Sequence, residues 1–221
     1  MSSSAVASAL SPAGPAPSAP MPPGIDLSED HIRAATELVE DTRTAFRTGS
    51  IYEPGLEPES IDIAYCRWLL VHLERPVSAL AAVWAALKPG GSMVMEEADV
   101  SAVYAEPHCE SYADMRDVAL AAGNQRGVDY TGGRRAHLWA RDAGFTIEHV
   151  SAYHPYYMDG PHKGFWNWTF QEAGANLVKA GLLSQENCDS LAAGMSAADS
   201  ASHSVVAHCR MHQVIARKPL A

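Results

Sequence analysis

Residues 61–99 read IDIAYCRWLLVHLERPVSALAAVWAALKPGGSMVMEEAD, and this stretch decides the fold class. Its first six residues are mostly apolar, which predicts a short strand buried in a sheet. A helix is expected to begin at or after Pro76, and its apolar stripe extends to Leu87. Residues 88–91, Lys-Pro-Gly-Gly, predict the end of that helix and a turn, and residues 92–95 predict the next strand.

The same alternation of strand and helix begins at Gly24. Residues 24–27 predict the end of a short strand, Ser28 is a suitable helix cap, and residues 44–49 predict a second short strand. After Asp99, helices are expected over residues 110–122 and 134–143, ended by Gly123 and Gly144, and a strand over residues 145–153. A helical region with an aromatic start (154–203) and a last strand (204–216) follow. This order predicts an α/β fold with a doubly wound, mostly parallel sheet.

The first residues have a different composition. Residues 1–24 contain six prolines and no charged residue, so neither a helix nor a central strand is expected there. The segment also lacks the basic start of a secretory signal and the arginines of a transit peptide. We expect a disordered Pro/Ala/Ser tail over residues 1–23 and a folded domain over residues 24–221.

Charge and composition exclude several classes of partner. The formal net charge of −10 opposes binding to phosphate backbones, so no nucleic-acid partner is expected. The apolar stretches are too short to cross a bilayer, so no membrane partner is expected either. Four scattered cysteines favour reduced thiols in a cytoplasmic protein over disulfides or a reactive thiol. Homo-oligomerisation stays open.

Histidines near the C-terminus invite a metal interpretation. In one continuous strand, however, His208, Arg210 and His212 would share one face, and Cys209 and its apolar neighbours would share the other. This alternation explains the residues without a metal, so no metal site is expected.

Residues 61–99 resemble the fourth strand, following helix and fifth strand of class I S-adenosylmethionine-dependent methyltransferases that act on small molecules, including their Leu-Lys/Arg-Pro-Gly-Gly turn. Residues 24–32, GIDLSEDHI, resemble the end of that family's second strand. The resemblance implies a Rossmann-like sheet with an antiparallel last strand, S-adenosylmethionine as cofactor and a small-molecule substrate. No Glu/Asp-x-Gly-x-Gly motif precedes Gly24, so the implied sheet lacks its first strand and glycine-rich loop. Residues 154–203 would form a helical cap insertion.

The resemblance also implies cofactor contacts. Asp26, followed by Leu27, would bind the ribose hydroxyls, and Ser50 and Ile51 would lie at the adenine, with Ser50 in place of the family's carboxylate. Cys66 and Arg67 would lie beside the methionine moiety, mainly through backbone groups.

Substrate contacts are assigned to Glu97, Tyr153 and Trp166. Glu97, with Glu96, flanks the expected acceptor position, where a carboxylate can orient a hydroxyl or act as a base; a solvated pair at a strand end is the alternative. Tyr153 and Trp166 belong to an aromatic group that would cap an apolar substrate or simply pack in the core. No catalytic residue is assigned.

Three functions are compatible with these residues. The first is methyl transfer to a small molecule, which depends on positioning more than on acid–base chemistry. The second is a degenerate or truncated methyltransferase domain that acts as a non-catalytic binding or interaction module. The third is a nicotinamide-dependent oxidoreductase, ranked last because it requires a glycine loop of the same kind.

Overall fold

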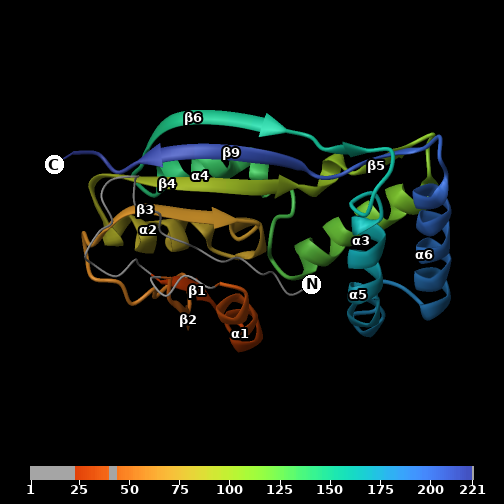
Figure 1. The fold of residues 1–221 in the computed structure, drawn as a ribbon, viewed down its shortest axis with the longest axis horizontal. Coiled ribbons are helices and arrows are strands. Elements are labelled where there is room, and N and C mark those ends of the chain that lie inside the picture. Colours follow the sequence, from red (N-terminus) through yellow and green to blue (C-terminus); the bar gives the residue numbers. More distant parts are fainter. Residues whose placement is uncertain (1–22, 40–43, 221) are drawn as a thin grey trace. The chain divides into compact units, whose positions relative to one another are not determined.

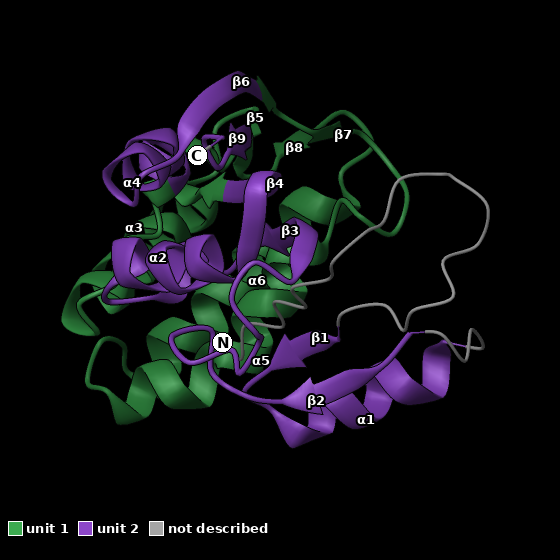
Figure 2. Ribbon diagram, turned by 90° about the vertical axis from the view of Figure 1, so that its left-hand side faces the viewer, with its two compact units in different colours: residues 1–2, 98–132, 152–211 green, residues 3–97, 133–151, 212–221 purple. Residues whose placement is uncertain are grey.

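The computed structural model describes residues 23–39 and 44–220, which divide into two compact units (Figures 1 and 2). Of the described residues, unit 2 contains 23–39, 44–97, 133–151 and 212–220, and unit 1 contains 98–132 and 152–211. The unit boundaries fall within three strands, β4 (Leu87–Asp99), β6 (Thr146–Tyr153) and β9 (Arg210–Arg217). The tail predicted for residues 1–23 lies outside the described residues except for its last one.

Unit 2 is built on strands that run mostly in one direction. β3 (Ile61–Arg67) pairs in parallel with β4, and the strand order continues through β9 to β6. Figure 1 shows β9 running opposite to β4 and β6. β1 (Gly24–Asp26) and β2 (Phe46–Thr48) form a separate parallel pair. The predicted α/β class is confirmed.

Two helices cover the larger sheet of unit 2. α2 (Pro76–Ala86) begins at the predicted proline, and α4 (Ala136–Asp142), preceded by the 3-10 turn η3 (Gly132–Arg135), packs against it. Gly144, at a φ of +98°, ends α4 as predicted. The buried core joins these helices to the strands through Ile61, Cys66, Leu80, Val83, Leu87, Met93, Met95, Ala136, Ala140, Phe145 and Val214.

The Lys-Pro-Gly-Gly segment differs from its predicted role as a turn ahead of the strand, because β4 already begins at Leu87. The register between β3 and β4 shifts here, and Gly90 has a φ of +78°. A Cβ on Gly91 would lie 2.9 Å from the Lys88 carbonyl oxygen, so the glycines allow an irregular start of a strand.

The helix α1 (Glu29–Leu38) begins at Ser28, whose side chain accepts a hydrogen bond from the His31 amide, which confirms the predicted cap. α1 contacts β1 and β2, but none of its residues is buried. Leu38, the last residue of the helix, is 82% exposed.

Unit 1 combines a small antiparallel sheet with three longer helices. The sheet has the order β5 (Tyr104–Glu106), β8 (Val205–Ala207), β7 (Tyr156–Tyr157), and the 3-10 turn η2 (Val100–Ala102) precedes it. α6 (Gln185–Ser200) packs against both α3 (Glu110–Gln125) and α5 (Phe165–Lys179). Asp199 of α6 accepts hydrogen bonds from Tyr112 of α3 at 2.5 Å and from Asn167 of α5 at 3.2 Å, so one carboxylate links the three helices.

Two predictions are wrong within unit 1. Gly123 does not end α3, which runs on to Gln125; instead Gly123 lies against Tyr130, whose Cδ2 would be 2.9 Å from an added Cβ. The last strand is not continuous either, because it is broken at His208 and Cys209. The His208 amide donates to the Pro155 carbonyl at 3.0 Å, and both His208 and Cys209 are buried, so the predicted alternation fails at this break.

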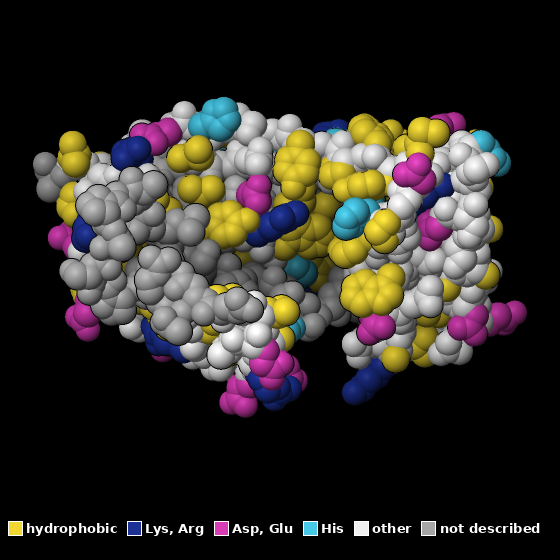
Figure 3. Space-filling model, viewed as in Figure 1, with side chains coloured by type: hydrophobic (Ala, Val, Ile, Leu, Met, Phe, Trp, Pro, Cys, Tyr) yellow, Lys and Arg dark blue, Asp and Glu magenta, His cyan; other side chains and the backbone are white. Residues whose placement is uncertain are grey.

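The surface carries dispersed charges. On the face in Figure 3, Lys and Arg side chains are spread out and form no basic patch. Among the helices in the described part of the chain, none is long and apolar enough to cross a membrane.

Candidate functional site

The predicted cofactor residues lie where the parallel strands of unit 2 end. Asp26 is the last residue of β1 and is only 6% exposed. Its Oδ1 accepts a hydrogen bond from the Ser28 amide at 2.8 Å and lies 3.2 Å from His31 Nδ1. Among the described residues both contacts of this carboxylate go to Oδ1, which leaves Oδ2 as an acceptor for a ligand hydroxyl.

The residues after β1 and β2 differ in accessibility. Leu27 is 72% exposed. Ser50 Oγ accepts a hydrogen bond from the Tyr52 amide at 3.2 Å, which shapes the turn that follows β2 and leaves the hydroxyl one further acceptor position. Ile51 is half-buried and packs against the core of unit 2. Leu27 is therefore exposed enough to contact a ligand, and Ser50 can accept a hydrogen bond from one. Ile51 contributes to the packing of the core.

Cys66 and Arg67 end β3 and face different environments. Cys66 is fully buried, and burial together with the nearby Glu97 raises the pKa of its thiol well above the usual range. This thiol is therefore inert as a nucleophile. The Arg67 side chain is 54% exposed, and its Nε lies 4.0 Å from Glu96 Oε2.

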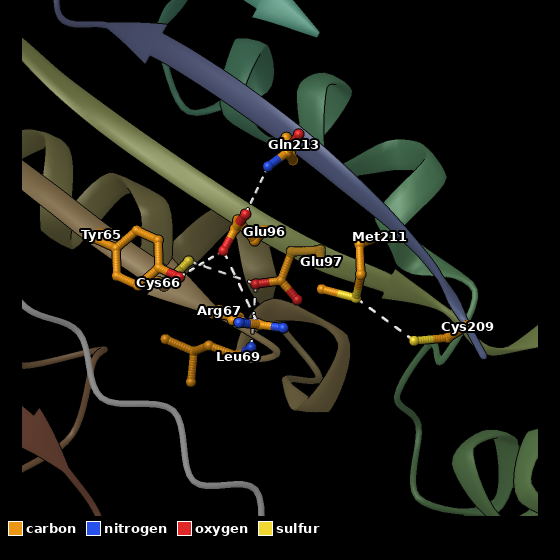
Figure 4. A network of polar contacts seen from close by, with 9 residues as sticks. All are labelled: Tyr65, Cys66, Arg67, Leu69, Glu96, Glu97, Cys209, Met211 and Gln213. Carbon is orange, nitrogen blue, oxygen red and sulfur yellow. Dashed lines mark hydrogen bonds and ion pairs between the residues drawn. The ribbon is translucent and has the colours of Figure 1, made fainter. Parts of the chain in front are cut away.

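Glu96 lies at the centre of a polar network on the sheet (Figure 4). Its Oε2 accepts from the Tyr65 hydroxyl at 2.7 Å, and its Oε1 accepts from Gln213 Nε2 at 2.7 Å. Partial burial alone would raise the pKa of Glu96, but the two hydrogen bonds and the charge of Arg67 outweigh it and lower the pKa. Burial, and to a smaller extent the hydrogen bond to Glu96, raise the pKa of Tyr65. Glu96 is thus an ionised group held between β3 and β9.

Glu97 points to the other side of β4 and is fully buried. Its Oε1 accepts from the amides of Leu69 at 3.1 Å and Leu70 at 3.0 Å, and its Oε2 accepts from the amide of Val71 at 3.3 Å. The Cys66 thiol lies 3.5 Å from Oε1. Burial raises the pKa of Glu97 to about 7, although these hydrogen bonds act to lower it. The prediction that Glu97 faces a substrate is therefore corrected, because its carboxylate is enclosed by backbone donors.

Residues 23–95 match the family model described as a methyltransferase domain. Over these residues the chain is similar to a methyltransferase domain. An uncharacterized methyltransferase of Schizosaccharomyces pombe is 32% identical over 128 residues, which cover 57% of this chain and 46% of that protein. An uncharacterized 37.1 kDa protein from a transposon of Streptomyces fradiae is 31% identical over 178 residues, which cover 77% of this chain and 50% of that protein.

The fold of this chain has solved counterparts. An S-adenosylmethionine-dependent methyltransferase of Methanosarcina mazei superposes with a TM-score of 0.53 at 14% identity, over 90% of this chain and 82% of that one. The chain spans about half the length of the two curated relatives that it matches.

The two aromatic residues predicted as substrate contacts lie in unit 1. Tyr153 ends β6 and is 38% exposed, so its side chain is accessible to a substrate. Trp166 is 1% exposed and packs beside Phe165 and His208, so the assignment of Trp166 as a direct substrate contact is corrected to a core position. Trp168, two residues further along α5, is 62% exposed instead. Helical spacing alone does not distinguish the two tryptophans.

Sequence reasoning did not find the strained backbone at Trp68. This residue follows β3 with a φ of +53°, a region that bulky residues rarely adopt, and its amide donates to the Glu96 carbonyl at 2.9 Å. No sequence signal marks this conformation, because the sequence offers no glycine or asparagine there. Within residues 23–39 and 44–220, no group of three or more His, Cys, Asp or Glu side chains is arranged to hold a metal ion.

Proposed function

We propose that this chain binds S-adenosylmethionine at the ends of β1, β2 and β3 and supports transfer of its methyl group to a small molecule. The observation that carries the proposal is Asp26, a buried carboxylate at the end of β1 whose contacts with described residues use Oδ1 alone. A carboxylate held in this way fits the vicinal hydroxyls of a ribose. Net acidity and dispersed surface cations favour a small-molecule acceptor over nucleic acid.

The remaining site residues fit the cofactor in part. Ser50 retains one acceptor position for an adenine amino group, and Leu27 offers apolar surface beside the ribose. Arg67 carries an exposed cation that suits the carboxylate of the methionine moiety. When bound, the cofactor supplies an electrophilic methyl group on a sulfonium. The task of the chain is to hold the acceptor in line with that methyl group and to exclude water.

The proposed sheet is the Rossmann-like sheet of the family without its first strand and glycine-rich loop. The separation of the β1–β2 pair from the β3–β4–β9–β6 sheet supports this arrangement. The same observation favours a second candidate function. A domain without that loop would act as a non-catalytic binding or interaction module, since the loop gives close backbone approach to the cofactor.

Ligand-observed NMR and calorimetry with S-adenosylhomocysteine test the proposal. Asp26→Ala should weaken binding about 10- to 100-fold, because a hydrogen bond to a charged group contributes about 1.5–3 kcal/mol. Asp30→Ala is the matched control, since Asp30 lies four residues away and is 78% exposed beside Arg33. Equal affinity in Asp26→Ala and Asp30→Ala would refute the assigned site.

Transfer itself is measured with a radiolabelled methyl group and a panel of small phenols, amines and carboxylic acids. Binding without transfer to any acceptor would favour the module function.

A further inference from the structure

The turn that follows β3 has an unfavourable backbone conformation. Trp68 has a φ of +53°, and the short helix η1 (Leu70–His72) begins two residues later. A large L residue gains nothing from this conformation by itself, so neighbouring groups must hold it. The turn is continuous with Cys66 and Arg67, the residues that we assign to the methionine end of the cofactor.

One carboxylate supplies much of that restraint. Both oxygens of Glu97 accept hydrogen bonds from three successive backbone amides, those of Leu69, Leu70 and Val71, and the side chain is fully buried. Figure 4 shows Glu97 beside Leu69 and Cys66. The amides at the start of a helix have no partner within it, so an external acceptor is needed in a dry environment. The Cys66 thiol, 3.5 Å away, ties the same carboxylate to the end of β3.

We propose that Glu97 is a positioning residue, which fixes the turn of residues 68–72 and through it the backbone of Cys66 and Arg67. The role of these two residues rests on the proposed function. Glu97 itself touches neither cofactor nor substrate. Its neighbour Glu96, one residue earlier, belongs to the network with Tyr65 and Gln213 and serves as an internal comparison.

The ionisation of Glu97 makes the positioning sensitive to pH. Burial holds its pKa at about 7, so a fraction of the carboxyl groups is protonated near neutrality. Opening of the turn would expose Glu97 to water and return its pKa toward 4.5. The closed turn therefore binds more protons between these two values, and its protection should rise as the pH falls through 7. The other titratable groups around this position are Tyr65, Cys66 and Arg67 on β3, Glu96 on β4 and His72 in η1. Of these groups, the Cys66 thiol contacts Glu97 Oε1 at 3.5 Å.

Hydrogen exchange of the amides of residues 66–71 tests the proposal without any cofactor. In Glu97→Gln, the amides of residues 69–71 should exchange at least about 10-fold faster than in the wild type at pH 8, and those of residues 66–68 should lose protection as well. Glu96→Gln should leave residues 69–71 protected. Unchanged protection in Glu97→Gln would overturn the proposal, and so would a loss confined to residues 69–71, because the carboxylate would then cap the turn without positioning the site.

The wild-type protein gives the same answer if Glu97→Gln does not fold. After correction for the intrinsic exchange rate, protection of residues 66–71 should rise between pH 8 and pH 6, and His72→Gln should show the same rise. A flat profile, or one that His72→Gln abolishes, would contradict the proposal.

Affinity for S-adenosylhomocysteine separates this inference from the proposed function. Wild-type binding that Glu97→Gln weakens at least about 10-fold supports both, and binding that Glu97→Gln leaves unchanged overturns the positioning role. Absence of binding by the wild type counts against the proposed function, and the exchange of residues 66–68 then decides the role of Glu97.

Discussion

Mild acid should destabilise unit 1 through His208. The His208 ring is buried at the break between β8 and β9, with ring centroids at 4.6 Å from Tyr157 and 5.5 Å from Phe165. Among the described residues its Nε2 has no hydrogen-bond partner. Burial lowers the pKa of His208 to about 4, which outweighs a backbone hydrogen bond to His162 that acts to raise it. In the folded state the His208 ring is therefore held in its neutral form.

The magnitude follows from the two pKa values. The unfolded chain protonates His208 near pH 6.5 and the folded chain only near pH 4, so the unfolded state holds more protons between these values. The contribution is fully present above pH 6.5 and is lost as the pH falls toward 4. Each pKa unit corresponds to about 1.4 kcal/mol, which gives a loss of about 3 kcal/mol. That is a large part of the usual stability of a domain.

Urea unfolding followed by circular dichroism at pH 7.5 and pH 4.5 measures this loss. His208→Phe keeps a ring against Tyr157 and Phe165 but cannot be protonated, so its loss of stability on acidification should be about 3 kcal/mol smaller than that of the wild type. His108→Gln is the matched control, because the side chain of His108 is 73% exposed beside Glu110. Other groups, Glu97 among them, contribute equally to wild type and variant and cancel in the comparison. An equal acid loss in wild type and His208→Phe would refute the reasoning.

Two further predictions concern the cofactor and the core. Residues 1–221 contain no Glu/Asp-x-Gly-x-Gly motif and have Ser50 at the position proposed to meet the adenine. These residues alone should bind S-adenosylmethionine at least about 100-fold more weakly than a methyltransferase domain that has the motif, and micromolar affinity in calorimetry would contradict this. Gly123→Ala should destabilise the protein by about 1–3 kcal/mol in urea unfolding, since the new methyl group would meet Tyr130 at 2.9 Å. Ala121→Ser, at an exposed position of the same helix, should cost far less.

Local signals were sufficient for much of unit 2. Ser28 caps a helix through its own side chain, Pro76 begins one, and Gly144 ends one at a φ of +98°, so each of these residues acts within its own turn of chain. Asp26 was placed correctly at the end of a strand by its position after two buried residues. The comparisons support the family that these signals indicated.

Signals that depend on distant partners could not be assigned from the sequence. Gly123 matches a helix stop, but the structure uses its small size against Tyr130. Glu97 follows an apolar strand like any solvated acid, and only the fold brings three amides of the preceding turn to it. Trp166 and Trp168 share a helix and differ in exposure by the packing of α5. Periodicity finds the element, whereas the role of a side chain depends on what the rest of the chain places beside it.

The position of β9 has a consequence for synthesis in the cell. This strand lies between β4 and β6 in the sheet, yet the ribosome makes it after α5 and α6. A nascent chain that has completed β6 therefore has no partner for the facing edges of β4 and β6 until β9 emerges. Such edges readily pair with other chains. Production of this protein should thus depend on the speed of translation across residues 154–209 and on chaperones that shield nascent chains.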